Sequence, residues 1–139
     1  MKTKLFIDTN VMLDLLGERM PFYISVAKIA TLADKGQIIL VASALSYSTV
    51  SYFLTKSENA EKAKVKLRKF KIISQICDLN EIIIEKGLNS NFSDLEDSLQ
   101  YFSALSSNCE ILITRNGKDF KESQIPIMTA EEYLMSIRQ

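Results

Sequence analysis

The chain has 139 residues, of which 47% are hydrophobic and 24% are charged, and its formal net charge is zero. A chain of this length can bury a sizeable core, so we expect a single domain over residues 1–139. Zero net charge provides no general attraction to nucleic acids or membranes. The sequence contains no histidine, which excludes Ser-His and Cys-His nucleophile systems and most zinc sites.

Apolar runs and helical periodicities alternate along the chain. The predicted strands cover residues 4–7, 37–42, 72–77, 110–114 and 125–128. The predicted helices cover residues 11–16, 21–35, 43–54, 57–71, 78–86 and 93–105, with a last helix that begins at Thr129. Strands separated by helices predict an α/β fold with three layers, α/β/α, around a mostly parallel central sheet.

The helix boundaries are predicted from residues that favour helix ends. Pro21 suits a first helical turn, and Gly36 suits the position just after a helix. Ser43 or Ser46 is the predicted cap of the third helix. The other predicted caps are Ser57 and the capping-box pairs Asp78 with Glu81, Ser93 with Glu96, and Thr129 with Glu132.

The neutral total hides an uneven charge distribution. Seven of the 17 basic residues lie between Lys56 and Lys71, and a run of acidic residues follows. A basic helix beside an acidic pocket is compatible with an anionic substrate. A solvated amphipathic helix is the simpler interpretation of the same pattern.

No segment indicates export or membrane insertion. The chain opens with no signal peptide, and no apolar run approaches the roughly 18 residues that span a bilayer. Cys77 and Cys109 border apolar segments, as reduced buried thiols do. We therefore expect a cytoplasmic protein that does not engage a membrane.

The first strand leads directly into Asp8, Thr9 and Asn10. In open α/β sheets, ligands bind beyond the carboxyl ends of the strands. A carboxylate at that place commonly holds a hard cation. Asp8 would alternatively cap the helix that follows, unless Asn10 is the cap and leaves Asp8 free for a ligand.

Further acidic residues follow later elements. Asp94 and Asp97 are three residues apart and share one face of a predicted helix. Acidic residues also suit a first helical turn, and Glu96 is explained as the capping partner of Ser93. Asp119 follows the fourth strand, where it would bind a ligand or cap a turn. Repulsion among these acids would favour a bound cation.

The order of these segments resembles the PIN domain family over essentially the whole chain. The resemblance rests on residues 6–11, on 93–100 followed by Ala104, on 113–120, and on 125–132. It implies Mg²⁺- or Mn²⁺-dependent cleavage of single-stranded or structured RNA by a VapC-like ribonuclease. It further implies that the protein is the toxin of a toxin–antitoxin pair.

The resemblance also implies roles for individual residues. Asp8 and Asp97 match metal-binding acids of the family, and Asp119 matches a further acid, so these three are the predicted catalytic and metal ligands. The predicted supporting residues are Asn10, Asp94, Thr114 and Asn116, the last at a position where many members have an acid. Arg115 is the predicted substrate-binding residue, through contacts with the RNA backbone.

One position departs from the family pattern. The family usually has a glutamate in the helix after the second strand, and this chain has Thr49. A neutral Thr49 lowers the expected affinity for metal, and Asp94 is a candidate to compensate. The alternative hypothesis is therefore a catalytically decayed PIN-fold module that binds RNA or a protein partner.

Two other fold families with an aspartate after the first strand rank lower. A haloacid-dehalogenase fold needs a second aspartate two residues later, where this chain has Asn10. A receiver domain needs acids before Asp8, and residues 1–7 contain none.

The predicted partners follow from the resemblance to the PIN domain family and from the distribution of apolar residues. They are an RNA substrate, a cognate antitoxin and a second copy of the chain in a homodimer, with no membrane. Apolar and aromatic residues in segments 12–23 and 47–53 exceed the obvious needs of a small core. They are candidates for a dimer face or an antitoxin groove, although core packing is the simpler explanation for any one of them.

Overall fold

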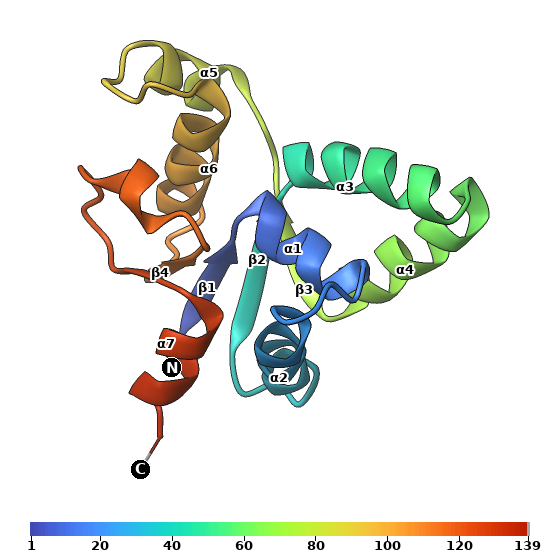
Figure 1. The fold of residues 1–139 in the computed structure, drawn as a ribbon. Coiled ribbons are helices and arrows are strands. Elements are labelled where there is room, and N and C mark those ends of the chain that lie inside the picture. Colours follow the sequence, from blue (N-terminus) through green and yellow to red (C-terminus); the bar gives the residue numbers. More distant parts are fainter. Residues whose placement is uncertain (139) are drawn as a thin grey trace.

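The structure is a computed structural model, and it describes residues 1–138. Five strands form one sheet in the order β3-β2-β1-β4-β5, and every neighbouring pair is parallel (Figure 1). The strands are β1 (Lys4–Ile7), β2 (Ile39–Ser43), β3 (Ser74–Cys77), β4 (Ile111–Ile113) and β5 (Ile127–Met128). The predicted parallel sheet is confirmed.

Helices cover both faces of this sheet. They are α1 (Thr9–Leu16), α2 (Tyr23–Asp34), α3 (Ala44–Ser57), α4 (Ala60–Ile72), α5 (Glu81–Leu88), α6 (Leu95–Ser106), α7 (Ala130–Ser136) and the 3-10 helix η1 (Gly117–Phe120). One core joins the sheet to α1, α2, α3, α4 and α7, and a second core joins it to α5, α6 and η1. The three-layer α/β/α arrangement is therefore also confirmed.

Strand β1 illustrates why the central strands are apolar throughout. Leu5 and Ile7 enter one core and Phe6 enters the other, and all three side chains are fully buried. Successive side chains of a strand point to opposite faces. A strand with helices on both faces therefore needs apolar residues at every position.

Several helix ends are confirmed. The Ser43 side chain accepts a hydrogen bond from the Leu45 N–H at the start of α3. Thr129 and Glu132 form the predicted capping box of α7. Gly36 follows α2 with a φ of 73°, a left-handed conformation that favours glycine.

Other helix starts were predicted too early. The caps of α4, α5 and α6 are Asn59, Asn80 and Asp94, and not Ser57, Asp78 and Ser93. Pro21 lies in the turn before α2, which begins at Tyr23. The starts of α4, α5 and α6 each have two or more polar residues within a few positions that can cap a helix. Packing of the helix on the sheet, which local sequence does not encode, decides which of them is used.

The strand order places a binding position at one edge of the sheet. After β1 the chain builds outward through β2 and β3, and it then returns to add β4 and β5 on the other side of β1. The carboxyl ends of β1 and β4 therefore form a topological switch point, where open α/β sheets bind ligands. Asp8 and Thr114 follow those two strands directly.

Among residues 1–138, no helix combines the length and the apolar character that are needed to cross a bilayer.

Candidate active site at the carboxyl end of the sheet

Asp8 lies at the switch point and is held by three polar neighbours. Its side chain is the N-cap of α1, because Oδ1 accepts a hydrogen bond of 2.9 Å from the Thr9 N–H. The Thr114 hydroxyl donates to Oδ2 at 2.9 Å. Asp8 itself is only 5% exposed. The capping alternative is thus correct for Asp8, and Asn10 lies inside the first turn of α1.

Two buried polar residues that the sequence analysis missed complete this arrangement. Gln100 and Ser46 are fully buried. The Gln100 amide nitrogen lies 2.7 Å from Thr9 Oγ1, 2.8 Å from Ser46 Oγ and 3.3 Å from Asp8 Oδ1, so its two N–H groups are shared among three oxygen atoms. Gln100 follows Asp97 by three residues and so shares its helix face. That spacing was the only available signal for it.

The acidic residues of this edge influence one another. Burial, and after it the charges of Asp94, Asp8, Asp119 and Glu96, together raise the pKa of Asp97 to about 6. Burial also raises the pKa of Asp8, against hydrogen bonds that lower it, and the charge of Asp119 adds to the rise. Asp8, Asp97 and Asp119 therefore share one electrostatic environment, although they come from distant parts of the chain.

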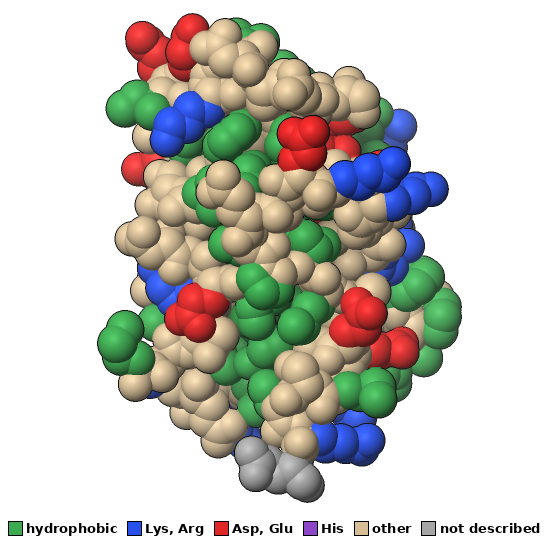
Figure 2. Space-filling view, turned by 90° about the vertical axis from the view of Figure 1, so that its left-hand side faces the viewer, with side chains coloured by type: hydrophobic (Ala, Val, Ile, Leu, Met, Phe, Trp, Pro, Cys, Tyr) green, Lys and Arg blue, Asp and Glu red, His purple; other side chains and the backbone are tan. Residues whose placement is uncertain are grey.

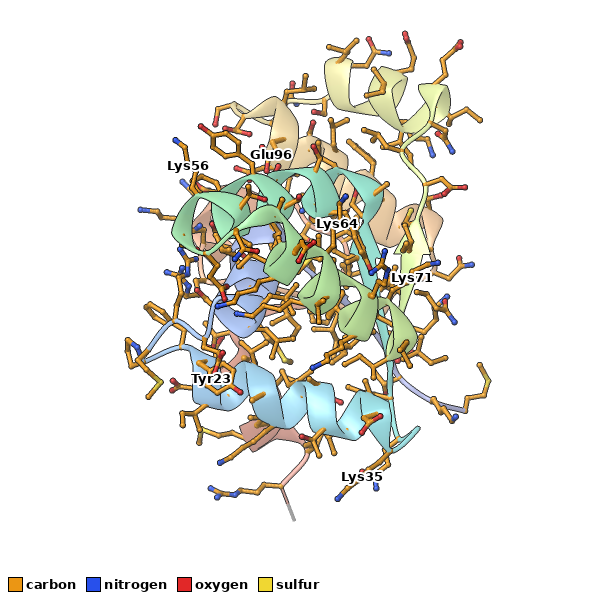
Figure 3. All side chains as sticks on the ribbon, turned by 90° about the vertical axis from the view of Figure 1, so that its right-hand side faces the viewer. Tyr23, Lys35, Lys56, Lys64, Lys71 and Glu96 are labelled. Carbon is orange, nitrogen blue, oxygen red and sulfur yellow. The ribbon has the colours of Figure 1, made fainter. Side chains whose placement is uncertain are left out.

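Glu96 is a further acid of the site. Its predicted role as the capping partner of Ser93 is wrong, because Asp94 caps α6 and accepts from the Asp97 N–H at 3.0 Å. Burial raises the pKa of Glu96, followed by the charges of Asp8 and Asp94, while interaction with Thr9 lowers it. Glu96 is labelled in Figure 3. Its carboxylate therefore belongs to the same acidic edge.

The loop after β4 brings Asn116 and Asp119 toward this edge. The Asn116 N–H donates to the Thr114 hydroxyl at 3.1 Å, and the Asn116 carbonyl accepts from the Asp119 N–H at 2.9 Å. Asp119 is exposed within η1. Thr114 thus links Asp8 on one side to the loop that carries Asp119 on the other.

Arg115 is engaged elsewhere. Its Nε donates to Asp14 Oδ2 at 2.8 Å, and its guanidinium carbon lies 3.9 Å from the centre of the Phe22 ring. Asp14 is fully buried and also receives the Arg19 Nε at 2.9 Å. The backbone carbonyl of Asn10 accepts from Arg19 at 3.4 Å. Substrate binding by Arg115 and a pocket role for Asn10 therefore stay predictions.

Thr49 lies in α3, which contains no acidic residue. This helix therefore contributes no carboxylate to the site. It reaches the site through Ser46 instead, whose hydroxyl lies 2.8 Å from that of Thr9.

The acids suit a hard cation chemically but do not form a ready-made cage for one. Among residues 1–138, no three Asp, Glu, Cys or His side chains are close enough together to hold a metal ion. The predicted gathering of Asp8, Asp97 and Asp119 at ligand distance is therefore not formed. Mg²⁺ is commonly bound by one or two carboxylates, with waters and substrate phosphates as its other ligands. The oxygen donors and their mutually raised pKa values fit such a partly hydrated ion.

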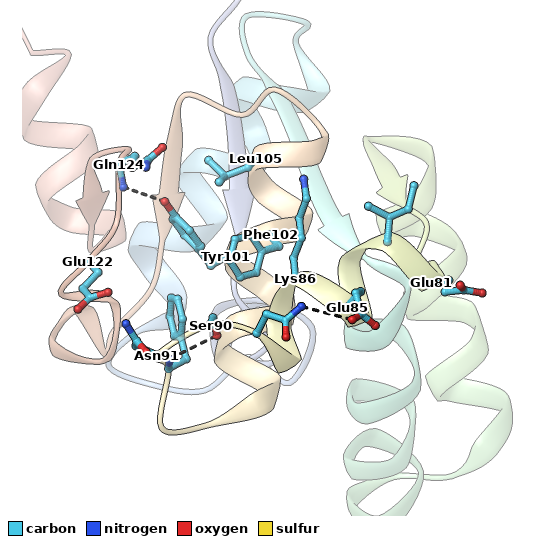
Figure 4. Close-up of a pocket in the computed structure, with 13 residues that line it drawn as sticks. Glu81, Glu85, Lys86, Ser90, Asn91, Tyr101, Phe102, Leu105, Glu122 and Gln124 are labelled. Atoms are coloured by element: carbon cyan, nitrogen blue, oxygen red, sulfur yellow. Dashed lines mark hydrogen bonds between the residues drawn. The ribbon is translucent and has the colours of Figure 1, made fainter.

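Two adjacent hollows share Asn91, Phe92 and Glu122 in their linings. One of about 750 Å³, between α5, α6 and the loop after η1, is lined in part by Tyr101 and Phe102, and Tyr101 accepts a hydrogen bond from the Gln124 N–H (Figure 4). None of the predicted site residues lines it. A hollow of about 280 Å³ contains Asp119 together with Lys118 and Lys121. The smaller hollow is thus the one that adjoins the candidate site.

Comparison with known proteins supports one family. The profile of the PIN domain matches residues 4–118. The chain is 32% identical over 136 residues to Ribonuclease VapC1 of Aquifex aeolicus (strain VF5), which covers 94% of this chain and 92% of that protein.

Solved structures agree on the fold. DNA-bound VapBC from Salmonella typhimurium matches 92% of this chain and 98% of its own, with a TM-score of 0.68 and 17% identity. VapBC2 from Rickettsia felis, bound to a promoter DNA fragment, matches 91% and 97%, with a TM-score of 0.66 and 19% identity. The five-stranded parallel sheet, the acidic switch point and these matches together place the chain in the PIN domain family.

Proposed function

We propose that this protein is a VapC-like endoribonuclease that depends on Mg²⁺ or Mn²⁺ and acts as the toxin of a toxin–antitoxin pair. The observation on which the proposal rests is the environment of the Asp8 side chain. It lies buried at the switch point, is oriented by neutral donors, and shares its electrostatic environment with Asp97 and Asp119. The ribonuclease name of the relative from Aquifex aeolicus supports the same activity.

In this proposal Asp8 and Asp97 hold the divalent ion, and Glu96 and Asp119 add negative charge around it. When bound, such an ion activates a water molecule and stabilises charge on the phosphate. The hydrogen bonds from the Thr114 hydroxyl and the Thr9 N–H favour the ionised form of Asp8, and so they counteract part of the rise in its pKa that burial causes. In this proposal Glu96 supplies a carboxylate to the site, whereas α3, which contains Thr49, supplies none.

Basic residues around the edge are suited to the phosphate backbone of RNA. Lys118 and Lys121 line the hollow that contains Asp119. Lys64 and Lys71 are exposed on α4 (Figure 3), but this helix leads to the start of β3, at the opposite end of the sheet. Arg115 would contribute only by exchanging part of its contact with Asp14 for a phosphate.

We also propose an antitoxin partner and a homodimer. The VapBC complexes among the structural matches support the first. Exposed aromatic residues support a protein partner in general, since Tyr52 is 57% and Phe53 is 47% exposed on α3. The face on the left of Figure 1 also carries hydrophobic side chains along its centre, with charged side chains nearer its edges (Figure 2).

The test is cleavage of single-stranded RNA in the presence of Mn²⁺. We expect the wild type to cleave, and we expect Asp97→Asn and wild type in excess EDTA to be inactive. Asp34→Asn is the matched control, because Asp34 is an exposed acid at the end of α2, which leads into the opposite end of the sheet, where β2 begins. Equal cleavage by wild type and Asp97→Asn would overturn the proposal. Absence of both cleavage and Mn²⁺ binding in the wild type would favour the decayed binding module.

A further inference from the structure

Gln100 connects the acidic edge to two other helices. Its side chain is fully buried in α6, and its amide nitrogen reaches Asp8 and Thr9 at the start of α1 and Ser46 in α3. The distances to the Thr9 and Ser46 hydroxyls are 2.7 and 2.8 Å. The Thr9 and Ser46 hydroxyls also contact each other at 2.8 Å. One amide thus fixes the relative positions of three helices around a single carboxylate.

The orientation of this amide is informative. Its nitrogen faces Asp8, and its carbonyl oxygen is buried without a hydrogen-bond partner among residues 1–138. The reverse orientation would place the carbonyl oxygen against the Asp8 carboxylate, where two acceptors repel. A buried, unpaired carbonyl costs free energy. The side chain is therefore arranged to serve Asp8 and is not satisfied in its own right.

The amide of Gln100 is a neutral donor, so it does not compensate the charge of Asp8. An arginine or lysine in this place would neutralise Asp8 and compete with a cation for its charge. An amide orients Oδ1 and leaves the negative charge available. Helix α3, which contains no acidic residue, takes part in this network through Ser46.

We propose that Gln100 is a positioning residue for Asp8, held in place by Ser46, and that it aims the Asp8 carboxylate at the reaction site. The inference rests on the proposed ribonuclease function. It assigns to Gln100 no contact with the substrate or with a metal ion. Its effect is transmitted through Asp8 alone.

The test compares Gln100→Met with the wild type in three measurements. Methionine has a similar length and volume but cannot donate a hydrogen bond. We expect kcat for RNA cleavage to fall 10- to 100-fold while KM changes less than threefold, since substrate contacts remain. We expect the Kd for Mn²⁺, measured by calorimetry, to rise about 10-fold. The midpoint of urea unfolding without metal stays equal or rises, because the unpaired carbonyl is removed together with the donor.

Controls separate positioning from a general role in folding. Gln75→Met, at an exposed site in β3, should match the wild type in every measurement. Ser46→Ala removes the anchor of the amide and should lower kcat about threefold. It serves as the deciding variant if Gln100→Met does not fold. A lower unfolding midpoint with unchanged kcat and Mn²⁺ affinity in these variants would overturn the inference.

The experiments distinguish a failure of the proposed ribonuclease function from a failure of the positioning role of Gln100. If the wild type binds Mn²⁺ but cleaves no RNA, the ribonuclease proposal falls, and the Mn²⁺ affinities of Gln100→Met and Ser46→Ala still decide whether Gln100 positions Asp8. If the wild type neither binds nor cleaves, both proposals are overturned.

Discussion

Helix α1 has a buried aspartate at its start and another near its end, and the partners of the two side chains differ in charge. Asp14, near the end of the helix, is paired with the charged side chains of Arg19 and Arg115. Asp8, at the start, receives only neutral donors, from Thr9, Thr114 and Gln100. The charge of one aspartate is compensated within the protein, whereas that of the other is left available.

Asp14 contributes to the stability of the fold, whereas Asp8 serves the proposed chemistry. The ion pairs of Asp14 join α1 to the loop after β4, and Arg115 also packs on Phe22. Asp8 lies beside further acids, and its pKa is raised, so its ionised form costs folding free energy. Such a cost is typical of sites selected for activity. The following variants test the comparison, in order of decreasing effect.

Asp8→Asn tests the functional end of the helix. We expect RNA cleavage to fall at least about 1000-fold, because a principal ligand of the proposed metal is lost. The free energy of unfolding should stay equal or rise, because a buried carboxylate with a raised pKa becomes neutral. Urea unfolding and a cleavage assay measure the two effects. Loss of stability with retained cleavage would reverse the roles assigned to the two aspartates.

Asp14→Asn tests the structural end. Two arginines lose their buried counter-charge, and we expect the free energy of unfolding to fall by about 3 kcal/mol. Arg115→Met should cost less, because Arg19 still pairs with Asp14. Urea unfolding gives both values, with Asp34→Asn as an exposed control near the end of α2. A loss for Asp14→Asn no larger than that for the control would contradict the structural role.

Thr114→Val tests how much Asp8 depends on a neutral donor. The substitution removes the hydroxyl that donates to Asp8 Oδ2, and we expect about 10-fold slower cleavage. Thr114→Ser keeps the hydroxyl and should retain most of the activity. Rates for the two variants at saturating RNA provide the comparison. Similar rates for valine and serine would show that the hydrogen bond to Asp8 is dispensable.

The pH dependence of stability is the smallest expected effect. The folded protein holds the Asp97 proton up to pH about 6, and the unfolded chain releases it near the ordinary value of 3.8. Metal-free protein should therefore lose stability as pH rises from about 4 to about 6, by about 1 kcal/mol once solvent screening is included. Asp97→Asn should lack this contribution when urea unfolding is followed across pH. An identical pH profile for the two proteins would rule out the raised pKa.

Short-range patterns in the sequence predicted the strands, most of the helices and the positions of the acidic residues. The apolar runs predicted the strands, because a strand buried on both faces has no polar position. Asp8, Asp97 and Asp119 each lie next to an element with a clear local pattern, and the resemblance to the PIN domain family predicted them as ligands. The start of α6 was misplaced by one residue, from Ser93 to Asp94. Adjacent polar residues have similar capping ability, so the local pattern did not distinguish them.

Only the tertiary structure decided which polar groups meet. Gln100 and Asp8 are separated by 92 positions in the chain, and Arg115 and Asp14 by 101. No periodicity relates such residues, since their contacts depend on how helices settle on the two faces of the sheet. The sequence alone therefore located the acidic edge. Packing determined that Asp14 would keep the arginines and that Asp8 would be held by an amide and two hydrogen-bond donors from threonine residues.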